Sequence, residues 1–339
     1  MSQGFEQTLA CGFHPRVKVD VNTGKVFVRS WEGDDVKISA EGAEPDVNSS
    51  GDRIVIRTEQ HCQLSLYLPR NCDLTVDGGN MEIDAAGISG TCNIDICDGS
   101  VSLCQWQGNV NIDTAHGNVR LEQVEGNLEV DTSGGSVEAT ACQGSLSADT
   151  GAGAVTVTDC RLSLSLDTGS GDVSVSRQQG AVAIDCASGA VEILSVSSHN
   201  LLAESGTGDI TAQLPGGNLG RWRLRSGNDI KLAVPANISA RFTLSAGHID
   251  ADSLELDNLH QKGNRVSGTL SDGNGRVDVR ARGGIFAQQA GPDVTIDIAQ
   301  PTETEEETIK ILTMVEQGTI SIEEAEKLID ALTGGGIDE

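Results

Sequence analysis

The residues most suggestive of chemistry are two D-T-G tripeptides at residues 149–151 and 167–169, each preceded by apolar residues. The same tripeptide occurs in aspartic proteases, where two carboxylates share a proton inside a water-filled cleft. Here, however, Asp149 and Asp167 belong to a longer series of equally spaced Asp residues. The series favours a role in turns, with each Asp side chain accepting backbone N–H bonds, over a role in catalysis.

This Asp series recurs every 18 residues without insertion, which is typical of a repeated structural unit. Its members are Asp77, Asp95, Asp113, Asp131, Asp149, Asp167 and Asp185. Carboxylates stacked about 5 Å apart would repel by about 1 kcal/mol per neighbour, so backbone donors or bound cations such as Ca²⁺ must offset the repulsion. Because each Asp precedes its glycines, the reverse of the calcium-binding repeat pattern, we predict a ladder without metal.

Other reactive residue types are scattered along the chain. The six His residues (His14, His61, His116, His199, His248 and His260) have neither metal-ligand nor triad spacing. The nine Cys residues form no C-x-x-C pair, so most are expected to be small buried hydrophobes in a reducing, cytoplasmic compartment. Arg221, Arg223 and Arg225 form one locally basic strand, which either contacts an anion or partner or simply alternates outward. We predict no enzyme, no catalytic residue, no metal site and no cofactor.

Composition narrows the kind of partner. A formal net charge of −27 repels phosphate backbones and anionic lipid headgroups, which argues against nucleic acid as a partner. The first residues lack a basic start followed by an apolar run, and no stretch approaches 18 apolar residues. We therefore expect no export signal and no direct membrane insertion. With 41 Gly, 7 Pro and 3% aromatic residues, the core must consist of Val, Ile, Leu and Cys.

The residues around each Asp predict the elements that position it. Apolar residues stand three and one before the Asp, and again six and eight after it, as in Val110 with Ile112 and Val119 with Leu121. Both pairs indicate short alternating strands. A third inward position lies eleven after the Asp, where Gln178 is the one polar exception. Turn glycines follow four after the Asp, where we predict positive φ: Gly99, Gly117, Gly135, Gly153, Gly171 and Gly189.

Three inward segments per 18 residues predict an all-β fold, a parallel β-helix (β-solenoid) whose coils stack backbone to backbone. Residues 1–72 are predicted to be N-terminal strands that cap the solenoid, because an open sheet edge invites aggregation. Residues 73–198 would form the regular 18-residue coils, and residues 199–300 less regular coils.

Residues 301–339 change to a helical pattern and predict an α-helical hairpin. Gly318 ends the first helix, and Ser321 with Glu324 forms a capping box at the start of the second. Isolated helices of about 12 residues are only marginally stable in water, so the apolar faces of these two helices must pack against a partner, a second copy or the solenoid. The predicted interface residues are Ile309, Leu312, Val315, Ala325, Leu328, Ile329 and Leu332.

Two segments carry a resemblance to known families. VDVNTGKVFVRSWEGDDVKISAEG, LYLPRNCDLTVDGG and the D-T-G-x-G-x-V units resemble the bacterial "putative adhesin" β-strand-repeat domain, a domain of unknown function. ETIKILTMVEQGTISIEEAEKLIDAL is similar to a short bihelical module of cell-envelope stress proteins, in which the module often precedes the β-repeats. The resemblance implies an envelope-stress setting for this chain.

The sequence thus predicts a non-enzymatic scaffold, a rigid solenoid that presents surfaces to protein partners and uses the hairpin for docking or oligomerisation. One alternative is a self-assembling filament or cytoskeletal-type protein, although the net charge opposes it. Another is a carbohydrate-binding or carbohydrate-active β-helix, whose site would have to lie in residues 199–300.

Overall fold

The computed structural model describes residues 4–290 of the 339-residue chain. These residues form 29 β-strands, and no helix occurs among them. The chain divides into two units, Met1–Gly291 and Pro292–Glu339, and the predicted helical hairpin at 301–339 lies outside the described residues. Within the described part, no helix is long and apolar enough to cross a membrane.

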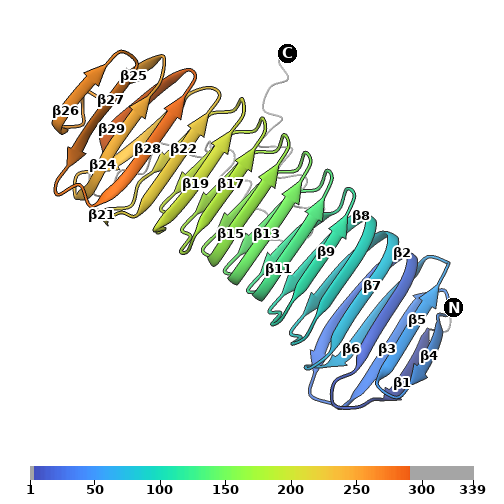
Figure 1. The fold of residues 1–339 in the computed structure, drawn as a ribbon. Coiled ribbons are helices and arrows are strands. Elements are labelled where there is room, and N and C mark those ends of the chain that lie inside the picture. The colour runs from blue at the N-terminus through green and yellow to red at the C-terminus, as the bar shows by residue number, and fades with distance from the viewer. Residues whose placement is uncertain (1–3, 291–339) are drawn as a thin grey trace, which may run out of the picture. The chain divides into compact units, whose positions relative to one another are not determined.

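The middle of the chain confirms the predicted all-β solenoid, because like residues of successive repeats pair in parallel register. Leu128 pairs with Leu146, and Leu146 with Leu164, one repeat further each time. The strands lie side by side in chain order through this region (Figure 1). They are β7 (Asp73–Ala86), β8 (Cys92–Cys104), β9 (Val110–Thr114), β10 (Asn118–Glu122), β11 (Glu125–Thr132), β12 (Val137–Thr140), β13 (Gln143–Thr150), β14 (Val155–Thr158), β15 (Arg161–Thr168), β16 (Val173–Ser176), β17 (Val182–Cys186), β18 (Val191–Leu194), β19 (Asn200–Ser205) and β20 (Ile210–Gln213).

Each coil has two sides made of strands and a third side of isolated bridges, such as Ser89 with Gln107 and Gln107 with Glu125. In β15, buried and exposed residues alternate strictly, so the predicted inward positions form the core. Gln178 is also fully buried, and its Nε2 donates to the Leu162 carbonyl at 2.5 Å. Trp106 Nε1 makes the equivalent bond to Gly90 at 2.9 Å, so Gln178 replaces a ring hydrogen bond at the same place in its own coil.

Non-glycine residues, which the sequence analysis missed, take the left-handed backbone conformation at one corner of each coil. Their φ values lie between 48° and 56°, the region that costs L-residues about 1–2 kcal/mol. They are Gln105, Gln123, Ala141, Asp159, Arg177 and Ser195. The coil geometry, repeated in register, therefore overrides local preference at this corner.

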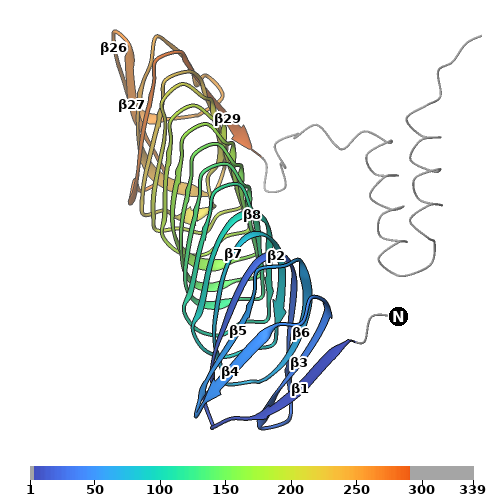
Figure 2. The same cartoon turned by 90° about the vertical axis from the view of Figure 1, so that its right-hand side faces the viewer.

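The N-terminal end departs from chain order. β2 (Arg16–Trp31) is the first coil of the stack, because it pairs in parallel with β7 on one side and with β5 (Arg53–Thr58) and β6 (Cys62–Pro69) on the other. β1 (Phe5–Ala10) and β3 (Asp35–Gly42) pair antiparallel, as do β3 with β6 and β4 (Asp46–Ser50) with β5. Figure 2 shows these strands at the end of the stack. Antiparallel strands thus follow the last parallel pairing at this edge.

The C-terminal end uses the same arrangement. β28 (Gly275–Ala281) pairs in parallel with both β22 (Arg221–Ser226) and β24 (Ile238–Ser245), so a late strand lies between two earlier ones. β29 (Gly284–Ala290) likewise lies between β23 (Ile230–Pro235) and β25 (His248–Asp250). β26 (Asp257–Lys262) and β27 (Arg265–Leu270) add antiparallel pairings beyond β24, and β21 (Gly217–Asn218) pairs with β24.

Candidate functional site

The seven Asp residues of the 18-residue series lie in one file on one face of the solenoid. Each pairs in register with the next, as Asp113 with Asp131 and Asp131 with Asp149. The file continues at both ends, because Asp20 pairs with Asp77 and Asp185 with Glu204. We call these residues the acidic ladder: Asp20, Asp77, Asp95, Asp113, Asp131, Asp149, Asp167, Asp185 and Glu204. The sequence analysis missed Asp20 and Glu204, because inserted residues break the 18-residue spacing there.

Basic residues neutralise only the ends of the acidic ladder. Arg57 Nε lies 3.5 Å from Asp20 Oδ2, Lys18 pairs with Asp77, and Arg225 Nη1 lies 2.9 Å from Glu204 Oε1. From Asp95 to Asp185, no ladder carboxylate has an ion pair or a hydrogen bond within the described part of the chain. Burial and then the neighbouring carboxylates raise the pKa of Asp131 and of Asp167 above the ordinary value. The middle of the ladder therefore carries uncompensated negative charge.

The D-T-G tripeptides form no catalytic dyad in the structure. Asp149 and Asp167 are exposed, and each has an equivalent Asp on its other side. The next residue, Thr150, is fully buried, and its Oγ1 accepts a 2.9 Å hydrogen bond from the Gly153 N–H. The same bond recurs in the coils of Thr114, Thr132 and Thr168. The predicted Asx-type role of the Asp was therefore wrong, since the buried Thr hydroxyl holds the turn.

The turn glycines are needed for close approach rather than for positive φ, except at Gly99, where φ is 123°. A Cβ on Gly153 would lie 1.7 Å from the carbonyl oxygen of Gly135, and a Cβ on Gly171 1.8 Å from that of Gly153. Gly135 and Gly189 are crowded in the same way, at 1.9 and 2.1 Å from a backbone carbonyl oxygen, whereas a Cβ on Gly117 would meet the Thr114 hydroxyl at 2.4 Å. The predicted positive φ was wrong at these positions, because stacked turns touch through their backbones.

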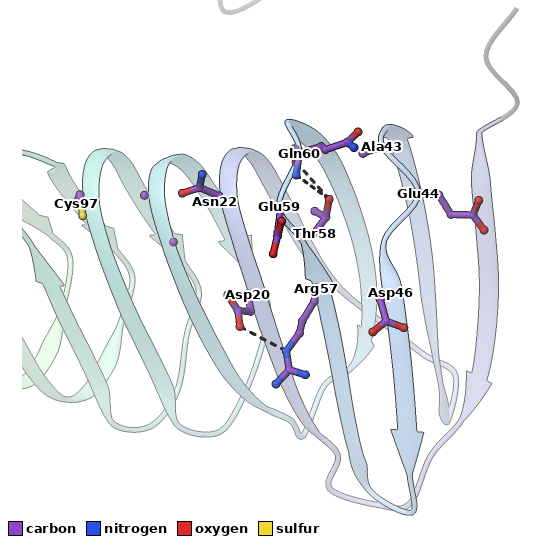
Figure 3. Close-up of a pocket in the computed structure, with 12 residues that line it drawn as sticks. Asp20, Asn22, Ala43, Glu44, Asp46, Arg57, Thr58, Glu59, Gln60 and Cys97 are labelled. Carbon is purple, nitrogen blue, oxygen red and sulfur yellow. Dashed lines mark hydrogen bonds and ion pairs between the residues drawn. The ribbon is translucent and has the colours of Figure 1, made fainter.

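A hollow of about 930 Å³ lies beside the N-terminal strands (Figure 3). In Figure 3, Arg57 points from β5 toward Asp20, while Asp46 and Glu44 lie further along the same side. Thr58 and Gln60 bond to each other at 3.2–3.3 Å, which closes the loop between them. The hollow is lined by polar and charged side chains, without a nucleophile hydrogen-bonded to a base.

A second, shallow groove of about 610 Å³ crosses β9, β11, β13 and β15 on the face of the acidic ladder. Short polar side chains line it, and some bond from coil to coil: Asn127 Nδ2 donates to Asn109 Oδ1 at 3.1 Å, and Ser145 Oγ to Asn127 Oδ1 at 2.9 Å. We call this feature the Asn/Ser groove, formed by Asn109, Asn111, Asn127, Glu129, Ser145, Ser147, Ser163 and Ser165.

The locally basic strand predicted at Arg221, Arg223 and Arg225 is β22, and the structure adds arginines from its neighbours. Arg221 pairs in register with Arg276 of β28, which pairs with Arg241 of β24. Arg280 stands beside Arg225 in the same way. The repeat pattern did not link these segments, because β28 lies far from β22 in the sequence and pairs with it only in the folded chain.

Cysteine and histidine residues form no site in the part of the chain described here. All nine Cys are free and six are buried; burial raises the pKa of Cys72 to about 12, so its thiol stays protonated. No group of His, Cys, Asp or Glu suited to hold a metal ion occurs among residues 4–290. His116 merely faces Asp98 at 3.2 Å in an exposed turn. The hairpin residues Ile309–Leu332 lie outside the described part.

The chain resembles known protein families and several solved structures. The chain matches the Toastrack DUF4097 family over residues 15–183 and 144–286, and a SHOCT-like domain over residues 306–336. No curated protein matches it. Similar solved structures include a "putative adhesin" from Parabacteroides distasonis (12% identity, 85% of this chain and 97% of that chain, TM-score 0.41) and one from Parabacteroides merdae (8% identity, 85% and 96%, TM-score 0.32).

Proposed function

Because the chain belongs to the Toastrack DUF4097 family, we propose that it is a non-enzymatic scaffold, whose solenoid presents long charged faces to protein partners. The observation that carries this proposal is the regularity of the outer surface, where equivalent side chains stand in files over many coils. A regular file suits an extended protein contact, whereas catalysis needs a few residues that break the pattern. The relatives named as adhesins are consistent with such a role.

The proposal also assigns the C-terminal segment a docking or oligomerisation role in cell-envelope stress signalling. The SHOCT-like match over residues 306–336 supports a separate module, and Pro292–Glu339 forms a unit of its own. Nine free thiols support a reducing, cytoplasmic compartment.

Deletion of residues 301–339 tests the docking role. We expect the solenoid to keep its far-UV β signal and its cooperative melting, while capture of partners from native cells in a pull-down is lost. A matched control replaces Glu323 and Glu326 by Gln, which leaves the predicted apolar interface intact and should preserve capture. Unchanged capture after the deletion would refute the docking role.

The two alternatives receive less support. Antiparallel strands at both ends of the stack disfavour a filament that grows by end-to-end stacking, because they close the parallel pattern. The Asn/Ser groove could in principle face a sugar, but its lining includes no aromatic ring to stack on one.

A further inference from the structure

The arginines near the C-terminal end of the solenoid are held in an arrangement that is unfavourable without a partner. Arg221, Arg276 and Arg241 lie opposite one another on three adjacent strands, and like charges in this position destabilise a sheet. Arg276 has Asp278 at 2.8 Å, whereas Arg221 and Arg241 have no ion pair in the described part of the chain. We call Arg221, Arg225, Arg241, Arg276 and Arg280 the arginine patch.

The arginine patch and the acidic ladder belong to the same face of the same sheet. Arg225 and Arg280 continue the file of the acidic ladder beyond Glu204, while Arg221 and Arg276 continue the file of the Asn/Ser groove beyond Asn200. The face is therefore acidic and grooved over β9, β11, β13 and β15 and basic over β22, β28 and β24. Figure 1 shows where these two groups of strands lie along the solenoid. One face thus offers both halves of an ionic contact.

The two halves also match in spacing. In the acidic ladder and in the arginine patch alike, successive side chains of a file lie on neighbouring strands, about 4.8 Å apart. Arg225 and Arg280, on adjacent strands, can therefore face two consecutive carboxylates without a change of register, while Arg221, Arg276 and Arg241 face the file of the groove. The groove beside the carboxylates is lined by short Asn and Ser side chains, so it leaves room for long arginine side chains. A flexible acidic peptide offers no such fixed spacing, whereas a second copy of this chain does.

At the file of Glu129, the two strands between the halves carry apolar outward residues, where a twofold axis would place them against themselves; Asp185 and Glu204 flank them in the file of the acidic ladder. β17 and β19 lie between the groove and the patch, and their outward residues at the file of Glu129 are Ala183 and Leu202. Leu202 is 37% exposed, one of four large hydrophobic residues exposed in the described chain. A surface that meets its own copy across a twofold axis must be self-complementary at its centre, which a small apolar area satisfies.

We infer that two copies of this protein associate antiparallel and face to face, with the arginine patch of each copy in the Asn/Ser groove and against the acidic ladder of the other. The axis passes near Ala183 and Leu202. The net charge of −27 per chain opposes this pairing only weakly at long range, since salt at physiological strength screens charges beyond about 8 Å. The contact uses the solenoid alone, so it does not rest on the hairpin.

A charge-swap experiment on the full chain tests the pairing. The wild type should sediment as a dimer at 0.15 M NaCl, and Arg225→Glu/Arg280→Glu should reduce the mass about twofold. Asp149→Arg/Asp167→Arg should do the same. Mixing the two variants should restore the dimer, because the acidic patch of one then faces the basic ladder of the other at one contact while the second contact is of the wild-type kind.

Two further variants keep the result interpretable. Arg120→Glu/Lys231→Glu makes the same change of charge on the neighbouring face and should remain dimeric. Leu202→Glu changes only the predicted axis and should dissociate the dimer, with unaltered circular dichroism. A monomeric wild type at tens of micromolar overturns the inference. So does an arginine double variant that stays dimeric, which would place the contact elsewhere, such as the hairpin.

Discussion

The regular middle of the solenoid and its two ends contain similar strands but follow different rules of connection. In the middle, each coil pairs in parallel with the coils before and after it in the chain. At the ends, the spatial order of the strands departs from their order in the chain. The early strand β2 lies between β7 and the pair β5 and β6, and the late strand β28 lies between β22 and β24. A parallel coil always leaves an edge on which another coil can pair, so the stack does not end by itself. Antiparallel strands cover this edge at each end.

The largest expected effect comes from removing a buried ring in the middle and comparing it with one near an end. Trp106 and Trp222 are both fully buried, and each Nε1 donates to a carbonyl at 2.9 Å. Either ring truncated to Ala should cost about 3–5 kcal/mol locally. We expect Trp106→Ala to lower the free energy of global unfolding in urea, because coils on both sides depend on it. Trp222→Ala should mainly increase hydrogen exchange within residues 219–290. Equal loss of protection along the whole chain in both variants would contradict the distinction.

A smaller effect is expected from adding one methyl group at a glycine. Gly153→Ala places a Cβ 1.7 Å from the Gly135 carbonyl oxygen, so the stacked turns must separate, at about 1–3 kcal/mol. Gly51, in the N-terminal turn between β4 and β5, has φ of 60° and nothing within 4 Å of an added Cβ. Gly51→Ala should therefore cost only its backbone strain, about 1 kcal/mol. Thermal denaturation of the two variants compares them; a larger loss for Gly51→Ala would show that φ, and not contact, governs the turns.

The smallest effect concerns the acidic ladder. Burial and neighbouring carboxylates raise the folded-state pKa of Asp131, so its share of stability is present below the unfolded pKa and is lost as pH rises through the folded pKa. In the monomeric Leu202→Glu background, Asp131→Asn/Asp167→Asn should thus stabilise the protein at pH 7 by a few tenths of a kcal/mol. The gain should vanish below about pH 4, where the wild-type carboxylates are protonated.

Asp159, which also lies in the regular coils, serves as a control because its pKa shifts in the opposite direction. Its pKa is lowered by the hydrogen bonds from Arg177, at 2.5 and 2.9 Å, so its contribution is present above the unfolded pKa and is lost as pH falls. Asp159→Asn should lower the melting temperature at pH 7, and this effect should shrink as the pH falls through the folded pKa. If both substitutions shift the melting temperature in the same direction at pH 7, the repulsion within the ladder does not limit stability.

Much of the fold was predictable because the repeat is local and strict. An 18-residue period with apolar residues at fixed offsets leaves one way to bury them, so the parallel coils and the file of Asp residues follow from spacing alone. The buried Thr hydroxyls were not predicted, because the D-T-G sequence does not show whether the Asp or the Thr side chain accepts the hydrogen bond in the turn. The crowding at Gly153 was also missed, since a sequence displays a glycine but not the backbone that touches it.

Periodicity, charge and the absence of large aromatic clusters were sufficient to establish a stacked, acidic, all-β protein from the order of residues. The meeting of Arg221, Arg276 and Arg241, the place of Asp20 at the head of the acidic ladder and the closure of both ends depend on the folded chain. The physical reason is that these pairings cross insertions of irregular length. No period relates the residues, and only the burial of whole coils against each other brings them together.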